Sequence, residues 1–315
     1  MSRVLWWMVG MVLAGGASAQ TWPTTHVRII TAGAGGGSDF ASRLIAAPLG
    51  ATLGQQVIVE NRGLLAADIA AKAAPDGYTM LFSTPGQSVI PLLLLGPKIG
   101  FDPFKEITPI TLLARQYNAL VVHPSVPARS VAELVALARK QPGKLSYGSS
   151  GNGSPNHLGM ELFKLDAKID LVHVPYKGAA PALLDVIAGQ VQLIITSPIS
   201  AAPHIATGKV RALATSGSKR NPLLPDLPTV AEAGLPGYEI TGWVGVLVPA
   251  GTGRETIAVL QADIARALTL PDLKEKFAHL GAEAGSSTPE QFAEFIQSEI
   301  AKWGRVIRDA GIEPN

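Results

Sequence analysis

A glycine-rich segment carries the first chemistry that the sequence suggests. Residues 27–31, VRIIT, form a β-branched run typical of a strand, and four of the five residues 33–37 are glycine. Glycine lets backbone N–H groups approach a ligand closely, and a helix capped by Ser38 or Asp39 would add positive potential at its N-terminus. The pattern predicts an anion-binding turn, most simply for a carboxylate. A turn that serves packing alone is the alternative.

Polar residues follow several other predicted strands in the same way. The strands over 78–82, 145–147 and 191–195 each end in a segment rich in serine, threonine, glycine or asparagine. Open α/β sheets bind ligands at the carboxyl ends of their strands. The predicted ligand-binding residues are Ala34, Gly35, Gly36, Gly37, Ser38, Asp39, Ser83, Thr84, Ser149, Ser150, Asn152, Asn156, Thr196 and Ser197. Among them, Asp39 is expected to cap its helix or hold the loop, because its charge repels a carboxylate.

Catalytic and metal-binding patterns are incomplete. Residues 148–153, GSSGNG, lack the Gly-x-Ser-x-Gly spacing of a nucleophile elbow. His157 and Glu161 are four residues apart on a predicted helix, but no third metal ligand accompanies them. Residues 33–38 match only part of a dinucleotide fingerprint. We therefore predict a protein that is not an enzyme and uses no cofactor or metal; a secreted hydrolase using Ser149 or Ser150 remains the alternative.

The predicted elements that position these loops alternate between strand and helix from residue 27 to residue 215. This alternation is typical of an α/β fold, with mixed, mostly parallel sheets that carry helices on both faces. Because glycine/serine loops recur in both halves, we expect two lobes that face each other across a cleft and close on a ligand.

Composition and the N-terminus indicate an exported protein. The 315 residues carry a formal net charge of +2, which gives no reason to expect nucleic-acid binding, and the absence of cysteine excludes disulfides and thiolate chemistry. Arg3, the apolar run 4–13 and the small residues 17–19 match a signal peptide. Cleavage after Ala19 would release a periplasmic protein, which we predict to be a monomer.

Many spaced segments resemble the Bug-type (TctC-like) solute-binding proteins of tripartite tricarboxylate transporters. The likeness covers nearly the whole chain after residue 19. It rests on LGQQVIVENR (53–62), AKAAPDGYTML (71–81), LSYGSSGNGS (145–154), HL (157–158), HVPYKG (173–178), GQV (189–191), GKVRAL (208–213), LPTVAEAG (227–234) and PAGT (249–252).

The resemblance implies a periplasmic receptor with two α/β lobes joined by two crossing strands. On this basis we expect residues 20–121 and 246–315 to form one lobe and residues 122–245 the other. The receptor would bind a small carboxylate and deliver it to a separate membrane permease. A receptor that signals to a membrane sensor is a further alternative.

Two departures from the family pattern bear on the ligand. Residues 31–34, TAGA, replace the usual aromatic and proline residues before the glycines. Thr196 stands where many relatives carry aspartate, so an ammonium group would lack a counter-charge there. Both changes favour an aromatic or bulky carboxylate without a positive group.

Overall fold

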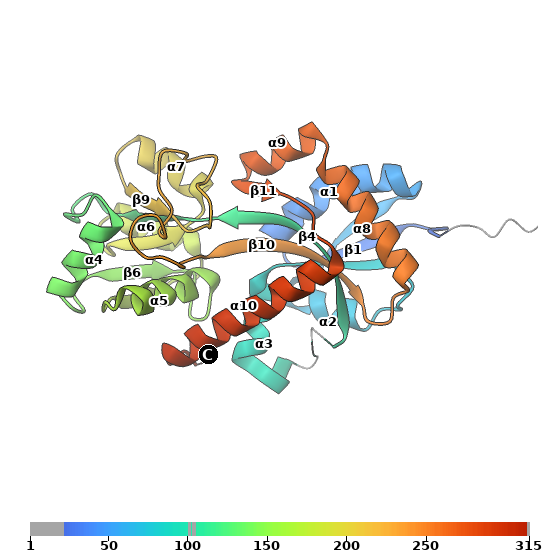
Figure 1. Cartoon of the computed structure of the whole chain (residues 1–315), viewed down its shortest axis with the longest axis horizontal. Coiled ribbons are helices and arrows are strands. Elements are labelled where there is room, and N and C mark those ends of the chain that lie inside the picture. The colour runs from blue at the N-terminus through green and yellow to red at the C-terminus, as the bar shows by residue number, and fades with distance from the viewer. Residues whose placement is uncertain (1–21, 100–101, 103–104, 314–315) are drawn as a thin grey trace, which may run out of the picture.

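The computed structural model describes residues 22–99, 102 and 105–313, and the predicted signal peptide lies outside this part of the chain. Two α/β lobes lie side by side and are joined by extended strands (Figure 1). The first lobe contains β1 (Val27–Thr31), α1 (Gly37–Leu53), β2 (Val57–Asn61), α2 (Ala66–Ala71), β3 (Thr79–Ser83), α3 (Val89–Leu95), β4 (Ile107–Tyr117), β10 (Thr241–Pro249), α8 (Arg254–Leu268), α9 (Pro271–His279), β11 (Ala282–Ala284) and α10 (Pro289–Asp309). Short 3₁₀ turns lie at Gly63–Leu65, Pro85–Gln87 and Gly96–Ile99.

The second lobe is built on a five-stranded sheet. It contains β5 (Ala119–Val122), α4 (Val131–Lys140), β6 (Ser146–Ser149), α5 (Pro155–Ala167), β7 (Val172–Pro175), α6 (Ala179–Ile187), β8 (Leu193–Thr196), α7 (Pro198–Ala206) and β9 (Arg211–Thr215). The strand order is β7-β6-β8-β5-β9, and that of the first lobe is β11-β4-β10-β3-β1-β2.

Consecutive apolar residues in the strands reflect burial on both faces of the first sheet. Ile29 packs in a core cluster with α1 and α8, whereas its neighbour Ile30 packs in the cluster that includes α2 and α10. Met80 and Leu81 divide between the two clusters in the same way. Parallel strands covered on both faces have this near-continuous hydrophobic pattern.

The two crossing connections introduce antiparallel pairing into both sheets. β4 continues directly into β5 of the second sheet, and the segment after β9 returns to the first sheet as β10. Within the described residues every antiparallel pair involves β4, β5 or β10, while β1–β3 and β6–β8 form parallel pairs. The parallel share is therefore smaller than strand–helix alternation alone suggests.

Strand pairing also shows at which residues the chain passes from one sheet to the other. The chain passes into the second sheet near Asn118 and returns to the first at Thr241. The expected boundaries at 121/122 and 245/246 lie inside β5 and β10. A strand that crosses between lobes keeps its hydrophobic pattern through the crossing, so sequence alone contains no boundary signal there.

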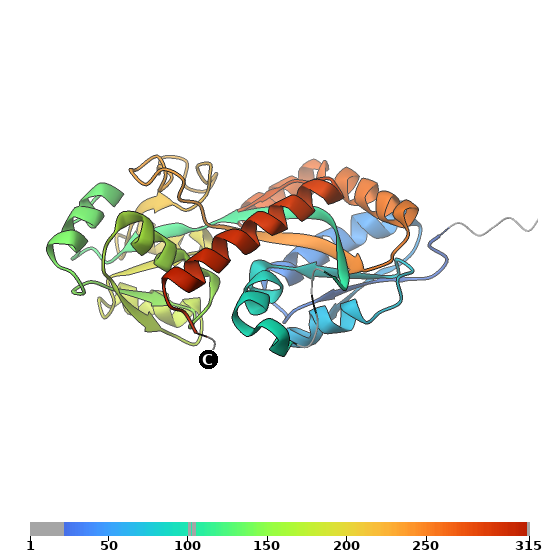
Figure 2. The same ribbon diagram turned by 60° about the horizontal axis from the view of Figure 1, so that its bottom comes forward.

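Helix α10 packs across the junction between the two lobes. It begins in the first lobe and runs across to the second (Figures 1 and 2), packing on β4, α3 and α5. Its Glu299 is 2% exposed and accepts hydrogen bonds from the indole N–H groups of Trp243 and Trp303, at 3.2 and 3.0 Å. Lys302 pairs with the same carboxylate. No helix among the described residues has the length and apolar character needed to span a bilayer.

We expect Glu299→Ala to lower the free energy of unfolding by about 2–4 kcal/mol, because two buried indole N–H groups would lose their acceptor. Urea unfolding followed by circular dichroism measures this change. Glu294→Ala, an exposed change on the same helix, serves as the control and should alter stability by less than about 0.5 kcal/mol. Equal effects in the two variants would contradict the structural role of Glu299.

Candidate ligand-binding site

The direction of the strands brings the predicted loops of the two lobes to facing edges. β3 is antiparallel to β10, which enters the first lobe from the second, so the parallel strands β1–β3 end on the side of the second lobe. β8 is antiparallel to β5, which leads away from the first lobe, so β6 and β8 end on the side of the first lobe. The two edges meet where a Cβ placed on Gly86 would lie 3.6 Å from Cγ of Pro155.

Asp39 holds the glycine loop in place. Its carboxylate accepts hydrogen bonds from the Gly35 backbone N–H at 2.9 Å, from Asn61 Nδ2 at 2.9 Å and from Arg43 Nε at 3.0 Å. Asn61 Nδ2 also donates to the Ala32 carbonyl at 3.0 Å. Burial raises the pKa of the Asp39 carboxyl, but these donors outweigh it and the pKa lies below its usual range. The geometry agrees with a positioning role for Asp39.

The loop that Asp39 supports exposes backbone donors. Residues 33–37 are exposed, and α1 begins at Gly37 with Gly36 as its N-cap residue. The first N–H groups of an α-helix have no carbonyl partner within the helix, and they carry the positive end of its dipole. Side chains are absent at Gly36 and Gly37, so no side chain of these residues covers the donors.

The loop after β3 is hydrogen-bonded to the start of α1. Ser83 is fully buried, and Thr84 is the N-cap of the turn Pro85–Gln87. The Gln87 side chain accepts from the Thr84 N–H and donates to Ser38 Oγ at 3.3 Å. Gln87 was missed by sequence reasoning, because its contact with Ser38 joins residues 49 positions apart.

In the second lobe, Asn156 organises the loop after β6. Its Oδ1 accepts from the Ser150 N–H at 3.1 Å, from Ser150 Oγ at 2.7 Å and from Ser154 Oγ at 2.8 Å. Ser154 also caps α5 by accepting from the His157 N–H. The hydroxyl of Ser150 therefore already donates a hydrogen bond within the loop. The loop places the start of α5 on the side of the first lobe.

Ser149 is tied to a buried aromatic cluster. It is fully buried, and its Oγ lies 2.6 Å from His173 Nε2 and 3.1 Å from the Gly151 carbonyl and N–H. The His173 ring stacks on that of His157 with 3.8 Å between centroids, and Tyr147 stacks on His173 at 5.0 Å. Nothing in the sequence indicates a site role for His173, since only the fold brings it beside Ser149.

Burial lowers the pKa of both histidines in this cluster. Burial, followed by the nearby charges of His173 and Lys164, lowers the pKa of His157 to about 3. His157 Nδ1 accepts from the Gly153 N–H at 3.0 Å, which leaves its proton on Nε2, 4.0 Å from Glu161 Oε1. Glu161 in turn bonds Tyr147 and pairs with Lys164 at 2.8 Å. These contacts place His157 and Glu161 in a structural polar network, and within the described residues no group of three metal-ligating side chains is assembled.

The remaining predicted residues are distributed differently. Asn152 donates its side-chain N–H to the Glu313 carbonyl at 3.1 Å, so it reaches toward the C-terminal segment. Thr196 ends β8 and is buried, and Ser197 is the N-cap of α7 without a side-chain cap bond. Both belong to the strand edge that faces the first lobe.

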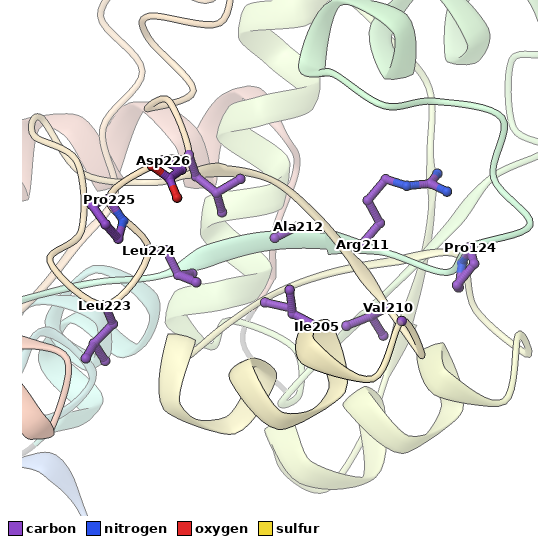
Figure 3. Close-up of a pocket in the computed structure, with 11 residues that line it drawn as sticks. Pro124, Ile205, Val210, Arg211, Ala212, Leu223, Leu224, Pro225 and Asp226 are labelled. Carbon is purple, nitrogen blue, oxygen red and sulfur yellow. The ribbon is translucent and has the colours of Figure 1, made fainter.

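A separate hollow on the second lobe contains none of the predicted residues. This pocket of about 480 Å³ lies between α7, β9 and the loop 223–227 (Figure 3). Its lining is mainly apolar, and Arg211 extends away from Leu223 and Leu224 to donate to the carbonyls of Val126 and Ala128. Since its charged donor is already used, the pocket is poorly suited to an anion.

Two α/β lobes joined by crossing strands, with strand-end loops facing each other, define a two-lobed solute-binding protein. Comparisons with known proteins agree. Residues 41–312 match the model of the tripartite tricarboxylate transporter family receptor. BugT of Bordetella pertussis is 34% identical over 304 residues, which cover 95% of this chain and 93% of BugT.

Two solved structures from Rhodopseudomonas palustris are also similar to the chain. Rpa4515, solved with adipate, is 39% identical with a TM-score of 0.77, covering 93% of this chain and 100% of that one. MatC (Rpa3494), solved with bound malate, is 33% identical with a TM-score of 0.73, covering 91% and 100%.

The chain belongs to the tripartite tricarboxylate transporter receptor family, as a Bug-type solute-binding protein. It is a receptor and not an enzyme. The hydrolase alternative is therefore wrong, and the short contact between Ser149 and His173 belongs to the architecture of a binding loop.

We expect Asp39→Asn to destabilise the protein at pH 7, with the difference from the unsubstituted protein shrinking as pH falls. A carboxyl whose folded pKa lies below its unfolded value stabilises the fold above the unfolded value of about 3.9 and loses this effect as pH falls through the folded pKa. Thermal unfolding between pH 3 and pH 7 checks this, with the exposed Asp272→Asn as control. A difference that is unchanged at low pH would contradict it.

For His157 we expect imidazole NMR signals of the neutral ring throughout the range from pH 7 to pH 5. The unfolded chain takes up a proton near pH 6.5, whereas the folded ring does so near pH 3. The free energy of unfolding therefore decreases as the pH is lowered below about 6.5. This contribution to the pH dependence of stability should disappear in His157→Phe but persist in the exposed His26→Gln. Protonation of His157 near pH 6 would contradict its burial.

Proposed function

We propose that the chain is a periplasmic receptor that binds a small carboxylate between its lobes and delivers it to the membrane permease of a tripartite tricarboxylate transporter. On this proposal the signal peptide 1–19 is removed and the mature receptor works as a monomer. Adipate and malate in two relatives support a carboxylate ligand.

The observation that carries the proposal is the start of α1. Its glycine N–H groups are exposed at the strand edge that faces the second lobe, and Asp39 holds the loop from behind. A carboxylate there would accept hydrogen bonds from Gly36, Gly37 and Ser38 without competing side chains. The predicted residues 34–39, 83–84, 149–150 and 196–197 would surround it.

Charge supports an anion without a positive group. The loops 33–38, 148–154 and 196–197 contain no arginine or lysine, so the attraction comes from helix starts and backbone N–H groups. The carboxylate of Asp39, which follows the first loop, is buried and already engaged by Gly35, Arg43 and Asn61, so it is not free to meet an ammonium group. With alanine and glycine at 32–34, the loop leaves room for an aromatic or otherwise bulky acid, which is the ligand class we propose.

A thermal-shift panel of di- and tricarboxylates and aromatic acids tests this function. A cognate acid at about 100 times its Kd should stabilise the fold by about 2.7 kcal/mol. Absence of a shift from every acid in the panel would contradict carboxylate binding.

Gly37→Asp provides the matching variant. A Cβ at Gly37 would meet no atom within 4 Å, and an added carboxylate in the first helical turn favours the helix. We therefore expect a folded protein whose affinity for the acid, measured by isothermal titration, falls tenfold or more through charge repulsion, about 1.4 kcal/mol. Gly37→Ser is the neutral control, and equal affinity in the two variants would place the anion elsewhere.

A further inference from the structure

A pocket of about 420 Å³ lies at the back of the connection between the lobes. Its walls come from β4, β11, α10 and the segment that follows β9. It is lined by Leu112, Arg115, Tyr117, Ser218, Lys219, Glu283, Ala284, Gly285, Ser286, Ser287, Gln291, Phe292 and Phe295. Ser218 and Lys219 belong to the chain returning from the second lobe, and Glu283 to the first, so the pocket bridges the two lobes.

Arg115 supplies a half-buried cation in this pocket. Its guanidinium carbon lies 4.7 Å from the centroid of the Phe295 ring. Within the described residues it has no carboxylate within 4.0 Å, although Glu283 is its cross-strand neighbour on β11. A guanidinium stacked on an aromatic ring keeps its in-plane N–H groups available for a bidentate contact with a carboxylate.

The acidic group of the pocket is already engaged. Glu283 Oε2 accepts a hydrogen bond from the Tyr117 hydroxyl at 2.9 Å, and Oε1 lies 3.8 Å from Lys219 Nζ. Burial, followed by the bond to Glu283, raises the pKa of Tyr117 to about 12, so the phenol stays a donor to Glu283 at neutral pH. Arg115 therefore faces the hollow with its charge unmatched, and Phe292, Phe295 and Leu112 contribute apolar surface beside it.

We propose that this hinge pocket is a second ligand site, which binds a small carboxylate with an apolar body. The carboxylate pairs with Arg115 and the body lies against the Phe295 side of the pocket, with Lys219 at the rim. The site is distant in the fold from the α1 loop, since β11 and β2 form opposite edges of the first sheet. Its occupant is in contact with both lobes.

Benzoate is the probe, and the Gly37→Asp protein is the background, so that binding at the α1 loop is weakened at least tenfold. Amide NMR spectra recorded during a titration should show saturable shifts at 218–219 and 284–287. Arg115→Gln should raise the apparent Kd tenfold or more, because a charge-assisted pair is lost. Arg129→Gln, an exposed change on the second lobe, should leave the Kd unchanged.

A second variant guards against misfolding of the first. A Cβ at Gly285 would meet no atom within 4 Å, so Gly285→Leu adds bulk to the pocket wall without a clash at Cβ and should abolish the shifts. Absent shifts at 218–219 and 284–287, or equal Kd values in Arg115→Gln and the background, would overturn the proposal. Neither result bears on the proposed function, which depends on the α1 loop of the unsubstituted protein.

Discussion

The antiparallel pairing of β4 with β10 is the constraint on which the rest of the structure depends. The two strands pair from Thr241 opposite Tyr117 to Pro249 opposite Ile107, and each connects one sheet to the other. Because β3 and β5 take their directions from these strands, the carboxyl ends of the parallel strands in both lobes are turned toward each other. Helix α10 then covers one side of the junction between the lobes, and its buried Glu299 accepts hydrogen bonds from two indole N–H groups.

A second physical feature is that each candidate loop holds its own shape. Asp39 gathers three donors in the first lobe, and Asn156 gathers three in the second. These side chains engage the Gly35 N–H in the first loop and both the N–H and the hydroxyl of Ser150 in the second. On the proposed function, the attraction for an anion would come from oriented backbone dipoles, which need no reorganisation when a ligand arrives.

Much of this could be predicted from the sequence, because its signals are local. The Gly33–Asp39 loop, the capped start of α5 and most strands follow from glycine placement, capping residues and apolar runs. Contacts between distant residues could not be predicted in this way. Ser149 beside His173, Gln87 beside Ser38 and Asn152 bonded to the Glu313 carbonyl each require the fold, and α9 and β11 lacked a distinct pattern.

The sequence by itself therefore determined the class of the protein, through spaced segments that resemble its family, and the strand-end loops, since helix starts and glycine turns are encoded within a few residues; that these loops prefer an anion stays a prediction. Only the tertiary structure decided which groups remain available to a ligand. Ser149, Ser150 and Asn152 have similar chemistry in the sequence, yet Ser149 and Asn152 bond distant residues, whereas Ser150 bonds the nearby Asn156. Arg115 shows the converse: an ordinary arginine in a strand becomes a cation that no carboxylate of the described residues pairs, in the pocket between the lobes. The crossing strands bring Phe295 and the returning chain around it.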